Sequence, residues 1–317
     1  MASASKAVDI YKPPKITWKK EMKKNWVLYC LFIPVAVYLI VMHYLPMFGI
    51  VMAFQDFNIA KGYFGSDFVG MQNFVDLFTG DQFPIALRNT LILAAFNLTF
   101  GFVAPIIFAF LITSVRNKKI RRVCQTMSYM PNFVASTVVV SLLKMFLAYD
   151  GPLTKILTAL GFEQQNWLAN NTPPVFWVIY TLLSIWSSFG FGSIMFVAAI
   201  NNLNGEIKEA AAMDGCTQLK LTFKVILPNI MPIVIMMFIL QVGLAIRTGS
   251  DRILLMYMPS TYNVADVLYT YTYRMAFTGM PNYGLSAASG LFQSVVGTIM
   301  LIASNKLSAK TAGSSLF

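Results

Sequence analysis

The chain has 317 residues, of which 57% are hydrophobic and 12% are charged, whereas an average soluble domain has about 25% charged residues. So much apolar surface excludes a water-soluble globular protein and a disordered chain. The net charge of +11 could serve nucleic-acid binding in a soluble protein, but in a membrane protein basic residues gather on the cytoplasmic side. We therefore predict an all-α, multi-pass membrane protein that binds no nucleic acid.

Six segments are predicted to span the membrane, since a spanning helix needs roughly 20 mostly apolar residues. These predicted spans are residues 26–54, 87–115, 131–148, 174–200, 229–246 and 284–303. They form one transmembrane domain, residues 26–303, between a basic N-terminal tail, residues 1–25, and a C-terminal tail, residues 304–317. The first apolar stretch is longer than the apolar core of a cleaved signal peptide, so we expect it to be the first span and not a signal peptide.

The positions of the charges predict the orientation. If the N-terminus is cytoplasmic, the inner segments hold 17 of the 24 basic residues and the outer segments hold six, with Lys144 near the end of the third span. The 13 acidic residues divide the other way, with five inside and eight outside. This bias predicts that both termini are cytoplasmic, in agreement with an even number of spans.

Two predicted outer loops carry structure of their own. Residues 55–86 contain the aromatic stretch FGSDFVGMQNF, which could lie on the membrane surface, and residues 263–277 could form a short helix. Anchoring by aromatic side chains at the interface explains both loops. The functional alternative is docking of an extracytoplasmic partner or a solute entrance.

The sequence shows no group of residues with the spacing that catalysis or metal binding needs. The three cysteines are far apart, and the lone histidine, His43, lies in an apolar run without a cluster of carboxylates around it. The chain has no Gly-x-x-x-x-Gly-Lys-Ser/Thr loop for ATP phosphates. We predict no catalytic residue, no metal and no cofactor in this chain. The chain has no pair of acidic residues of the kind that membrane enzymes use, which argues against a membrane enzyme. We also find no convincing repeat between its two halves, which argues against a secondary transporter.

The most informative segment is the predicted cytoplasmic connection 201–228, NNLNGEIKEAAAMDGCTQLKLTFKVILP. Asn204 can cap a helix that continues through three alanines, and Gly215 provides its stop. Thr217 can cap a second short helix that ends at Pro228. A short helix with an alanine face suits a groove on another protein; alternatively, it only covers the ends of the spans.

This loop resembles the EAA motif of ABC importer permeases, the inner membrane components of binding-protein-dependent transport systems. Glu209-Ala210-Ala211 is followed after three residues by Gly215, and after nine more by Val225, two residues before Leu227-Pro228. Four further stretches are similar to the sugar branch of this family, above all to polysaccharide and complex-oligosaccharide permeases such as alginate-oligosaccharide importers. These stretches are FQDFN (54–58), FGSDFVGMQNF (64–74), RNT (88–90) and Tyr129-Met130-Pro131.

The resemblance implies a type I ABC importer permease in the bacterial plasma membrane, with an oligosaccharide as the solute. It implies four kinds of partner: a second homologous permease in a heterodimer, two cytoplasmic ABC ATPases that bind ATP and Mg²⁺, an extracytoplasmic solute-binding protein, and membrane lipid. The implied coupling residues are Glu209, Ala210, Ala211, Asp214 and Gly215, with Leu227 and Pro228 closing the loop. The alternative function is a permease for a peptide, an amino acid or an anion.

Polar side chains within the spans are candidates for the solute pathway, because such residues usually face a bundle interior or a cavity. The candidates are Tyr44, Asn97, Trp186, Ser187, Gln241, Arg247 and Gln293. Hydrogen bonding between packed helices is the alternative role for the Asn, Gln and Ser side chains. Arg247 is either an interfacial anchor or a contact for an acidic sugar such as a uronate.

Overall fold

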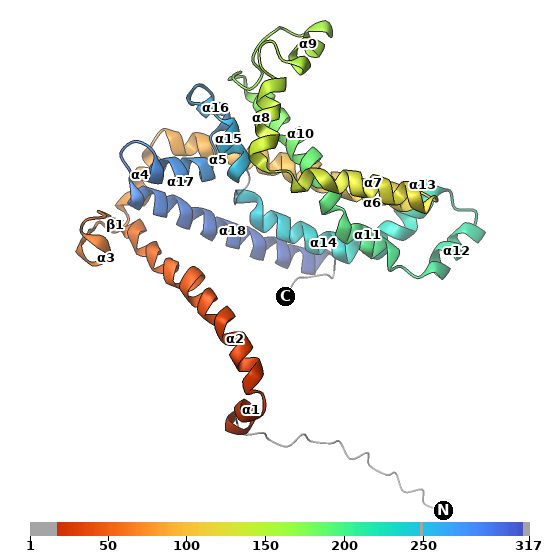
Figure 1. Ribbon diagram of the computed structural model, residues 1–317, viewed down its shortest axis with the longest axis horizontal. Helices are drawn as coiled ribbons and strands as arrows, with labels where there is room; N and C mark the ends of the chain where they lie inside the picture. Colours follow the sequence, from red (N-terminus) through yellow and green to blue (C-terminus); the bar gives the residue numbers. More distant parts are fainter. Residues whose placement is uncertain (1–17, 248–249, 313–317) are drawn as a thin grey trace, which may run out of the picture. The chain divides into compact units, whose positions relative to one another are not determined.

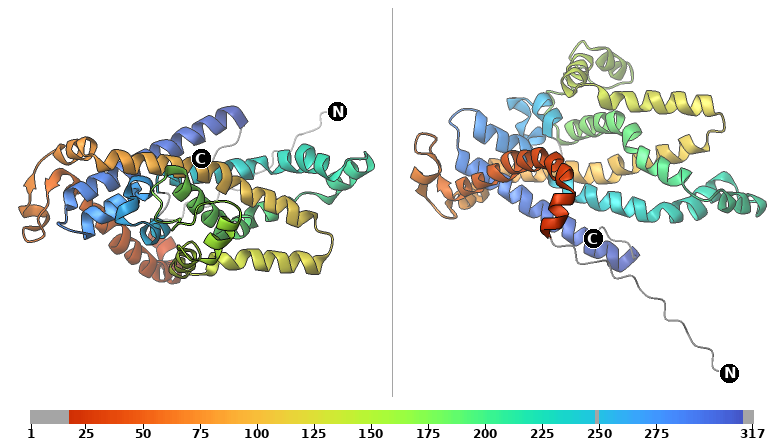
Figure 2. Two further views of the ribbon diagram at one scale, coloured as in Figure 1. Left: turned by 90° about the horizontal axis from the view of Figure 1, so that it is seen from above. Right: turned by 60° about the horizontal axis from the view of Figure 1, so that its bottom comes forward.

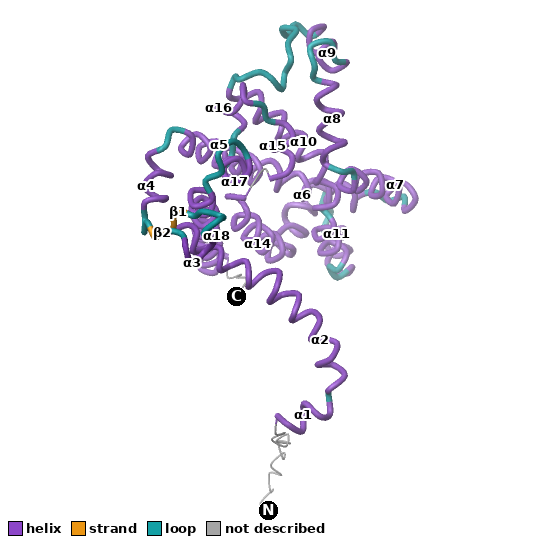
Figure 3. Tube along the Cα trace, turned by 60° about the vertical axis from the view of Figure 1, so that its left-hand side comes forward, coloured by secondary structure: helices purple, strands orange, loops and turns teal. Residues whose placement is uncertain are grey.

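The computed structural model describes residues 18–247 and 250–312, which are mostly helical (Figures 1 and 3). The chain divides into two compact units, Met1–Ile50 and Val51–Phe317. Among the described residues, five helices are long and apolar enough to cross a membrane, or six if one bent pair counts as a span. The predicted helical membrane protein is confirmed at that level.

The first unit contains α1 (Trp18–Lys24), α2 (Trp26–Leu39) and the π-helix η1 (Ile40–Tyr44), and η2 (Leu45–Phe54) continues into the second unit. No residue of α2 or η1 is buried. A helix that is apolar on every side belongs in lipid or against another apolar surface. The continuous run Trp26–Phe54 has the bounds predicted for the first span.

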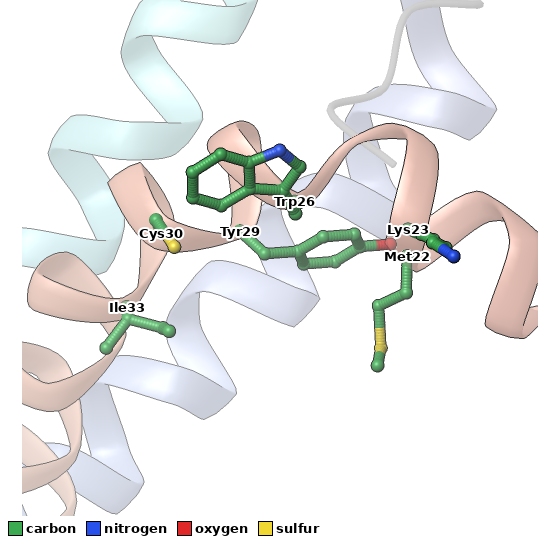
Figure 4. A pocket seen from close by; sticks show the side chains of 6 residues that line it. All are labelled: Met22, Lys23, Trp26, Tyr29, Cys30 and Ile33. Atoms are coloured by element: carbon green, nitrogen blue, oxygen red, sulfur yellow. The ribbon is translucent and has the colours of Figure 1, made fainter.

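An open apolar hollow of about 590 Å³ lies where α1 meets α2 (Figure 4). Its lining consists of Met22, Lys23, Trp26, Tyr29, Cys30 and Ile33. Lys23 is the sole charged group in this lining, and the aromatic rings of Trp26 and Tyr29 are typical of a helix end at the membrane–water interface. The hollow therefore lacks the converging polar groups of a solute site.

The spans of the second unit are longer than predicted at several ends. Four runs are long and apolar enough to cross a membrane: Gln82–Ser114, Pro173–Asn201, Tyr283–Lys310, and Gln218–Met256, which includes residues 248–249 outside the described ranges. Their main helices are α5 (Gln82–Phe96), α6 (Phe102–Ser114), α10 (Pro173–Gly192), α11 (Ile194–Asn201), α14 (Leu227–Leu244) and α18 (Tyr283–Ala312). Helix α18 packs against α14, and α6 packs against α10 and α11.

The segment predicted as a third span, residues 131–148, is bent in the structure. Helix α7 (Lys118–Tyr129) continues through η4 (Met130–Phe133), and α8 (Ser136–Phe146) then leaves at an angle of 93°. The bend occurs because Val134 and Ala135 have extended ψ angles of 131° and 136°. At 1.5 Å per residue, the 11 residues of α8 reach only about half of the ~30 Å hydrocarbon layer. The six-span count thus depends on counting the bent pair as one span.

The segments between spans are folded rather than extended. Residues 55–79 form β1 (Gln55–Asp56), α3 (Gly62–Gly65), β2 (Asp67–Phe68) and α4 (Gln72–Thr79), in which β1 pairs with β2 in antiparallel fashion. Other short helices of this unit include α9 (Pro152–Ala159), α15 (Ser250–Met256), α16 (Tyr262–Ala265) and α17 (Leu268–Phe277). Helix α4 packs on α18, where a Cβ atom on Gly284 would lie 2.6 Å from the Gln55 carbonyl oxygen.

Candidate functional site

The predicted coupling loop contains a short helix that is capped at its start. Helix α12 (Gly205–Met213) lies at the end of the second unit opposite α3 and α4 (Figures 1 and 2). The Asn204 Oδ1 atom accepts a hydrogen bond from the Glu206 N–H at 3.1 Å, and the Asn204 amide donates to Glu206 Oε2 at 3.1 Å. The sequence therefore places the helix start at Asn204 by ordinary capping.

The end of α12 needs a glycine because of its backbone. Gly215 has a φ of +71°, and the Cys216 N–H donates to the Ala211 carbonyl at 3.0 Å. These are the features of a Schellman termination, in which the left-handed residue favours glycine. No atom lies within 4 Å of the position of a Cβ on Gly215, so conformation and not crowding sets this requirement.

The second helix of the loop does not end at Pro228, so that part of the prediction is wrong. Thr217 caps α13 (Gln218–Lys220), and the chain then passes through the π-helix η5 (Leu221–Ile226) directly into α14. Pro228 lies in the first turn of α14, where its missing N–H costs least, and the π-helix carries the chain into that turn. Leu227 and Pro228 thus begin α14, as expected.

Most of the proposed coupling residues are exposed. Glu209, Ala210, Asp214 and Gly215 are exposed, whereas Ala211 is only 7% exposed, and α12 packs against η5. The alanine face is therefore only partly available to a partner, because Ala211 is buried within the chain whereas Ala210 is exposed. The loop is tied to another span where the Gln218 amide donates to Ser114 Oγ at 3.0 Å, at the end of α6.

A buried polar clamp, which sequence analysis missed, lies away from α12. It joins Asn89 and Thr90 of α5 to α16 and α17. The Asn89 amide donates to the carbonyls of Asn263 and Asp266 at 3.1 and 2.9 Å, and the Leu268 N–H donates to Thr90 Oγ1 at 2.9 Å. Asn89 and Thr90 are fully buried. The RNT stretch, which indicated the family, therefore has a tertiary role: it holds the segment before α18.

The clamp continues in a buried ion pair. Arg274 donates to Asp266 at 2.7 Å, with side-chain exposures of 11% and 3%, and the Thr270 hydroxyl donates to the other Asp266 oxygen at 2.7 Å. The guanidinium also lies 4.4 Å from the centre of the Tyr262 ring. Burial lowers the pKa of Arg274, but the hydrogen bond and charge of Asp266 raise it more, so the net pKa is above its ordinary value. The sequence signal that could have revealed this ion pair is the spacing of Asp266 and Arg274, two opposite charges eight residues apart.

The candidate pathway residues lie in different surroundings. Two of them are buried: the Ser187 hydroxyl donates to the Leu183 carbonyl at 2.9 Å, and the Gln293 amide donates to Thr272 Oγ1 at 2.9 Å. These bonds lie within and between helices, as expected for helix-packing residues. The others are Tyr44, Trp186 and Arg247, which are exposed, and Asn97 and Gln241, which are half-buried. Their role in a pathway stays a prediction.

Residues 101–312 match the family model described as binding-protein-dependent transport system inner membrane component. The chain belongs to this family. The permease is 37% identical to protein LplB of Bacillus subtilis over 303 residues, covering 95% of this chain and 94% of LplB. It is 33% identical to the polygalacturonan/rhamnogalacturonan transport system permease protein YteP of the same organism, covering 93% and 94%.

A solved structure has the same fold as the permease. This is a chain in the crystal structure of a bacterial alginate ABC transporter in complex with an alginate pentasaccharide-bound periplasmic protein. The TM-score is 0.85 at 33% identity, covering 94% of this permease and 99% of that chain. The predicted resemblance to sugar-branch ABC importer permeases is therefore confirmed, together with the type I permease fold.

Proposed function

We propose that this permease forms half of the translocation pathway of an ATP-driven importer for an oligosaccharide. The observation that carries the proposal is the near full-length match, in fold and sequence, to a chain of the alginate transporter. The exposed, doubly capped helix α12 adds the element through which a separate ATPase would move the spans. The proposed location is the bacterial plasma membrane, with both termini cytoplasmic, which rests on the basic bias of the inner segments.

The proposed assembly contains a second homologous permease, in a heterodimer, and two cytoplasmic ATPases. The ATPases would bind ATP and Mg²⁺, since the chain lacks the phosphate-binding loop. An extracytoplasmic binding protein would deliver the solute, which the family description and the periplasmic protein in the alginate complex both support. In this assembly α12 would dock on an ATPase through Glu209, Ala210, Asp214 and Gly215, with Ala211 facing η5.

Uptake by the reconstituted complex tests the solute class. The complete complex in proteoliposomes, with its binding protein and ATP, should accumulate labelled oligosaccharides in preference to peptides, amino acids or inorganic anions. Accumulation of one of those other solutes instead would replace the sugar with the alternative function. Within the complex, Trp186→Ala and Gln241→Ala should slow uptake without weakening assembly if these residues contact the solute.

A charge reversal tests the coupling role of α12. Glu209→Arg should lower solute-stimulated ATP hydrolysis at least about tenfold, because a reversed charge in a docked interface costs several kcal/mol. Glu163→Arg is the matched control, since Glu163 is also exposed but precedes α10 in a predicted outer segment. Normal hydrolysis and normal assembly in Glu209→Arg would contradict the assignment.

A further inference from the structure

Helix α7 has one face against the protein and another face that is largely exposed. It packs against α6 and α10, where a Cβ atom on Gly190 would collide with the Ser128 carbonyl group and Cys124 borders an apolar cluster. The other face carries an apolar stripe at helical spacing, 54–67% exposed, which continues into η4 and consists of Ile120, Val123, Met127 and Met130. Such a stripe belongs against lipid or another apolar surface.

The same helix begins in a dense cluster of positive charge. Five of the seven residues 116–122 are basic, namely Arg116, Lys118, Lys119, Arg121 and Arg122. Exposed Lys119 lies one turn before Val123, so a cation and the apolar stripe share the outer face of α7. Residues 123–143 contain no charged side chain. Charge is therefore confined to the start of α7, and the stripe follows it along the helix axis.

The neighbouring elements supply no counter-charge to this basic cluster. Residues 82–149, which include α6 and α7, contain no Asp or Glu, and neither does α10. Within residues 18–247 and 250–312 the ion pairs are Lys61–Asp67 and Arg274–Asp266, so none involves the cluster. The positive charges are thus open to an anionic partner outside the chain.

The order of these two features along α7 indicates the kind of partner. Helix α7 belongs to the bent pair that together is long and apolar enough to cross a membrane. Its start lies at the same end of the second unit as α12 (Figure 2), and Ser114, four residues before Lys118, accepts the hydrogen bond from Gln218 of the coupling loop. A bilayer presents the same order, with charged headgroups outside and hydrocarbon inside. An acidic water-soluble protein could neutralise the cations, but it would not explain the exposed stripe that follows them.

We propose that the start of α7 binds anionic phospholipid in the leaflet on the α12 side, with the acyl chains along the apolar stripe. A guanidinium such as that of Arg122 binds a phosphate through two parallel hydrogen bonds, and the Lys119 ammonium adds a point charge. Zwitterionic lipid would cover the stripe equally well, but it would leave the five cations without a net counter-charge. The site therefore selects lipids with a net negative headgroup, whatever the solute of the importer is.

Photolabelling of the complete permease–ATPase complex in nanodiscs tests the proposal. The nanodiscs contain phosphatidylglycerol and phosphatidylcholine in equal amounts, and in parallel samples one or the other carries a photoactivatable group close to its phosphate. Peptides that cover residues 116–133 should react with the phosphatidylglycerol probe at least about tenfold more than with the phosphatidylcholine probe. Lys119→Gln and Arg122→Gln should each lower this ratio about fivefold, which corresponds to ~1 kcal/mol for one cation near an anionic surface. Lys119→Arg should retain the ratio.

Lys155→Gln is the matched control, since Lys155 is an exposed lysine on α9 in a predicted outer segment, and it should leave the ratio unchanged. Size-exclusion chromatography checks that every variant complex has assembled. Equal labelling of the wild type by both probes would overturn the proposal, as would an unchanged ratio in the two Gln variants. Labelling by neither probe would also overturn it and would assign this face of α7 to another subunit.

Uptake by proteoliposomes separates the failure of this inference from the failure of the proposed function. A complex that imports an oligosaccharide but labels equally with both lipids contradicts the lipid site alone. A complex that prefers phosphatidylglycerol at α7 but imports no oligosaccharide contradicts the proposed function and leaves the lipid site standing.

Discussion

The α12 end and the α16–α17 end of the second unit are held by different kinds of interaction. At the α16–α17 end, fully buried Asn89 and Thr90 bind backbone groups more than 170 residues away in the chain. At the α12 end, the capping bonds at Asn204 and after Gly215 join near neighbours, and the exposed Gln218–Ser114 bond ties the loop to α6.

This difference indicates where a partner is needed. A buried polar network is costly when any member is unsatisfied, so the clamp specifies one arrangement of its own chain. The α12 helix has only nine residues, and helices this short are marginal without packing. A protein that covers the exposed residues of α12 would therefore stabilise the helix, whereas the clamp is already stabilised by contacts within its own chain.

Breaking the buried ion pair should have the largest effect. Asp266→Asn leaves the Arg274 charge buried without a counter-charge, which costs about 3–5 kcal/mol. The melting temperature of the purified complex should fall clearly. Since the pKa of Arg274 is raised, its contribution is complete below the pKa of the unfolded state and is lost only as pH rises through the still higher folded pKa. The wild type should therefore lose none of this contribution between about pH 7 and pH 9.

The exposed ion pair provides the control for that prediction. Asp67→Asn breaks the Lys61–Asp67 pair, in which the side chains are 52% and 75% exposed. Solvent screens such a pair, so the melting temperature should not change measurably. The double variant Asp266→Asn/Arg274→Gln should recover part of the loss, because it removes the buried charge. Equal melting temperatures for Asp266→Asn and Asp67→Asn would show that the clamp does not stabilise the fold.

Two glycines with similar backbone geometry can distinguish the effect of local backbone strain from a role in coupling to the ATPase. Gly215 and Gly161 have φ values of +71° and +94°, open space at the Cβ position, and the same termination, in which Phe162 N–H donates to the Leu157 carbonyl after α9. Alanine at either position should cost about 1–2 kcal/mol of local backbone strain. Gly215→Ala should also reduce solute-stimulated ATP hydrolysis, and Gly161→Ala should not. Equal hydrolysis in both variants would remove Gly215 from the coupling surface.

The sequence predicted the elements that depend on local rules. Hydrophobic length located the five long apolar helices among the described residues. The capping residue Asn204 and the stop at Gly215 placed α12, because each depends on residues within a few positions. The bend at Val134 and the passage through Pro228 were missed, since a continuous apolar run does not reveal a change of direction or a π-helix.

The clamp could not be derived in the same way. Asn89 and Thr90 carry no local sign that their partners are Asn263, Asp266 and Leu268, because sequence separation hides a contact that only the tertiary fold creates. The family resemblance marked the RNT stretch without giving its role.

The smallest predicted effect concerns the tie between the coupling loop and α6. Gln218→Ala removes an exposed side-chain hydrogen bond, so the loss of stability should be below about 1 kcal/mol. Gln164→Ala is the matched control, because Gln164 makes exposed bonds to Tyr149 and Asp150. If the tie transmits movement from α12 to α6, Gln218→Ala should lower the solute imported per ATP hydrolysed while Gln164→Ala leaves it unchanged. An unchanged ratio in both variants would mean that α12 acts on the spans only through η5, against which it packs and which leads directly into α14.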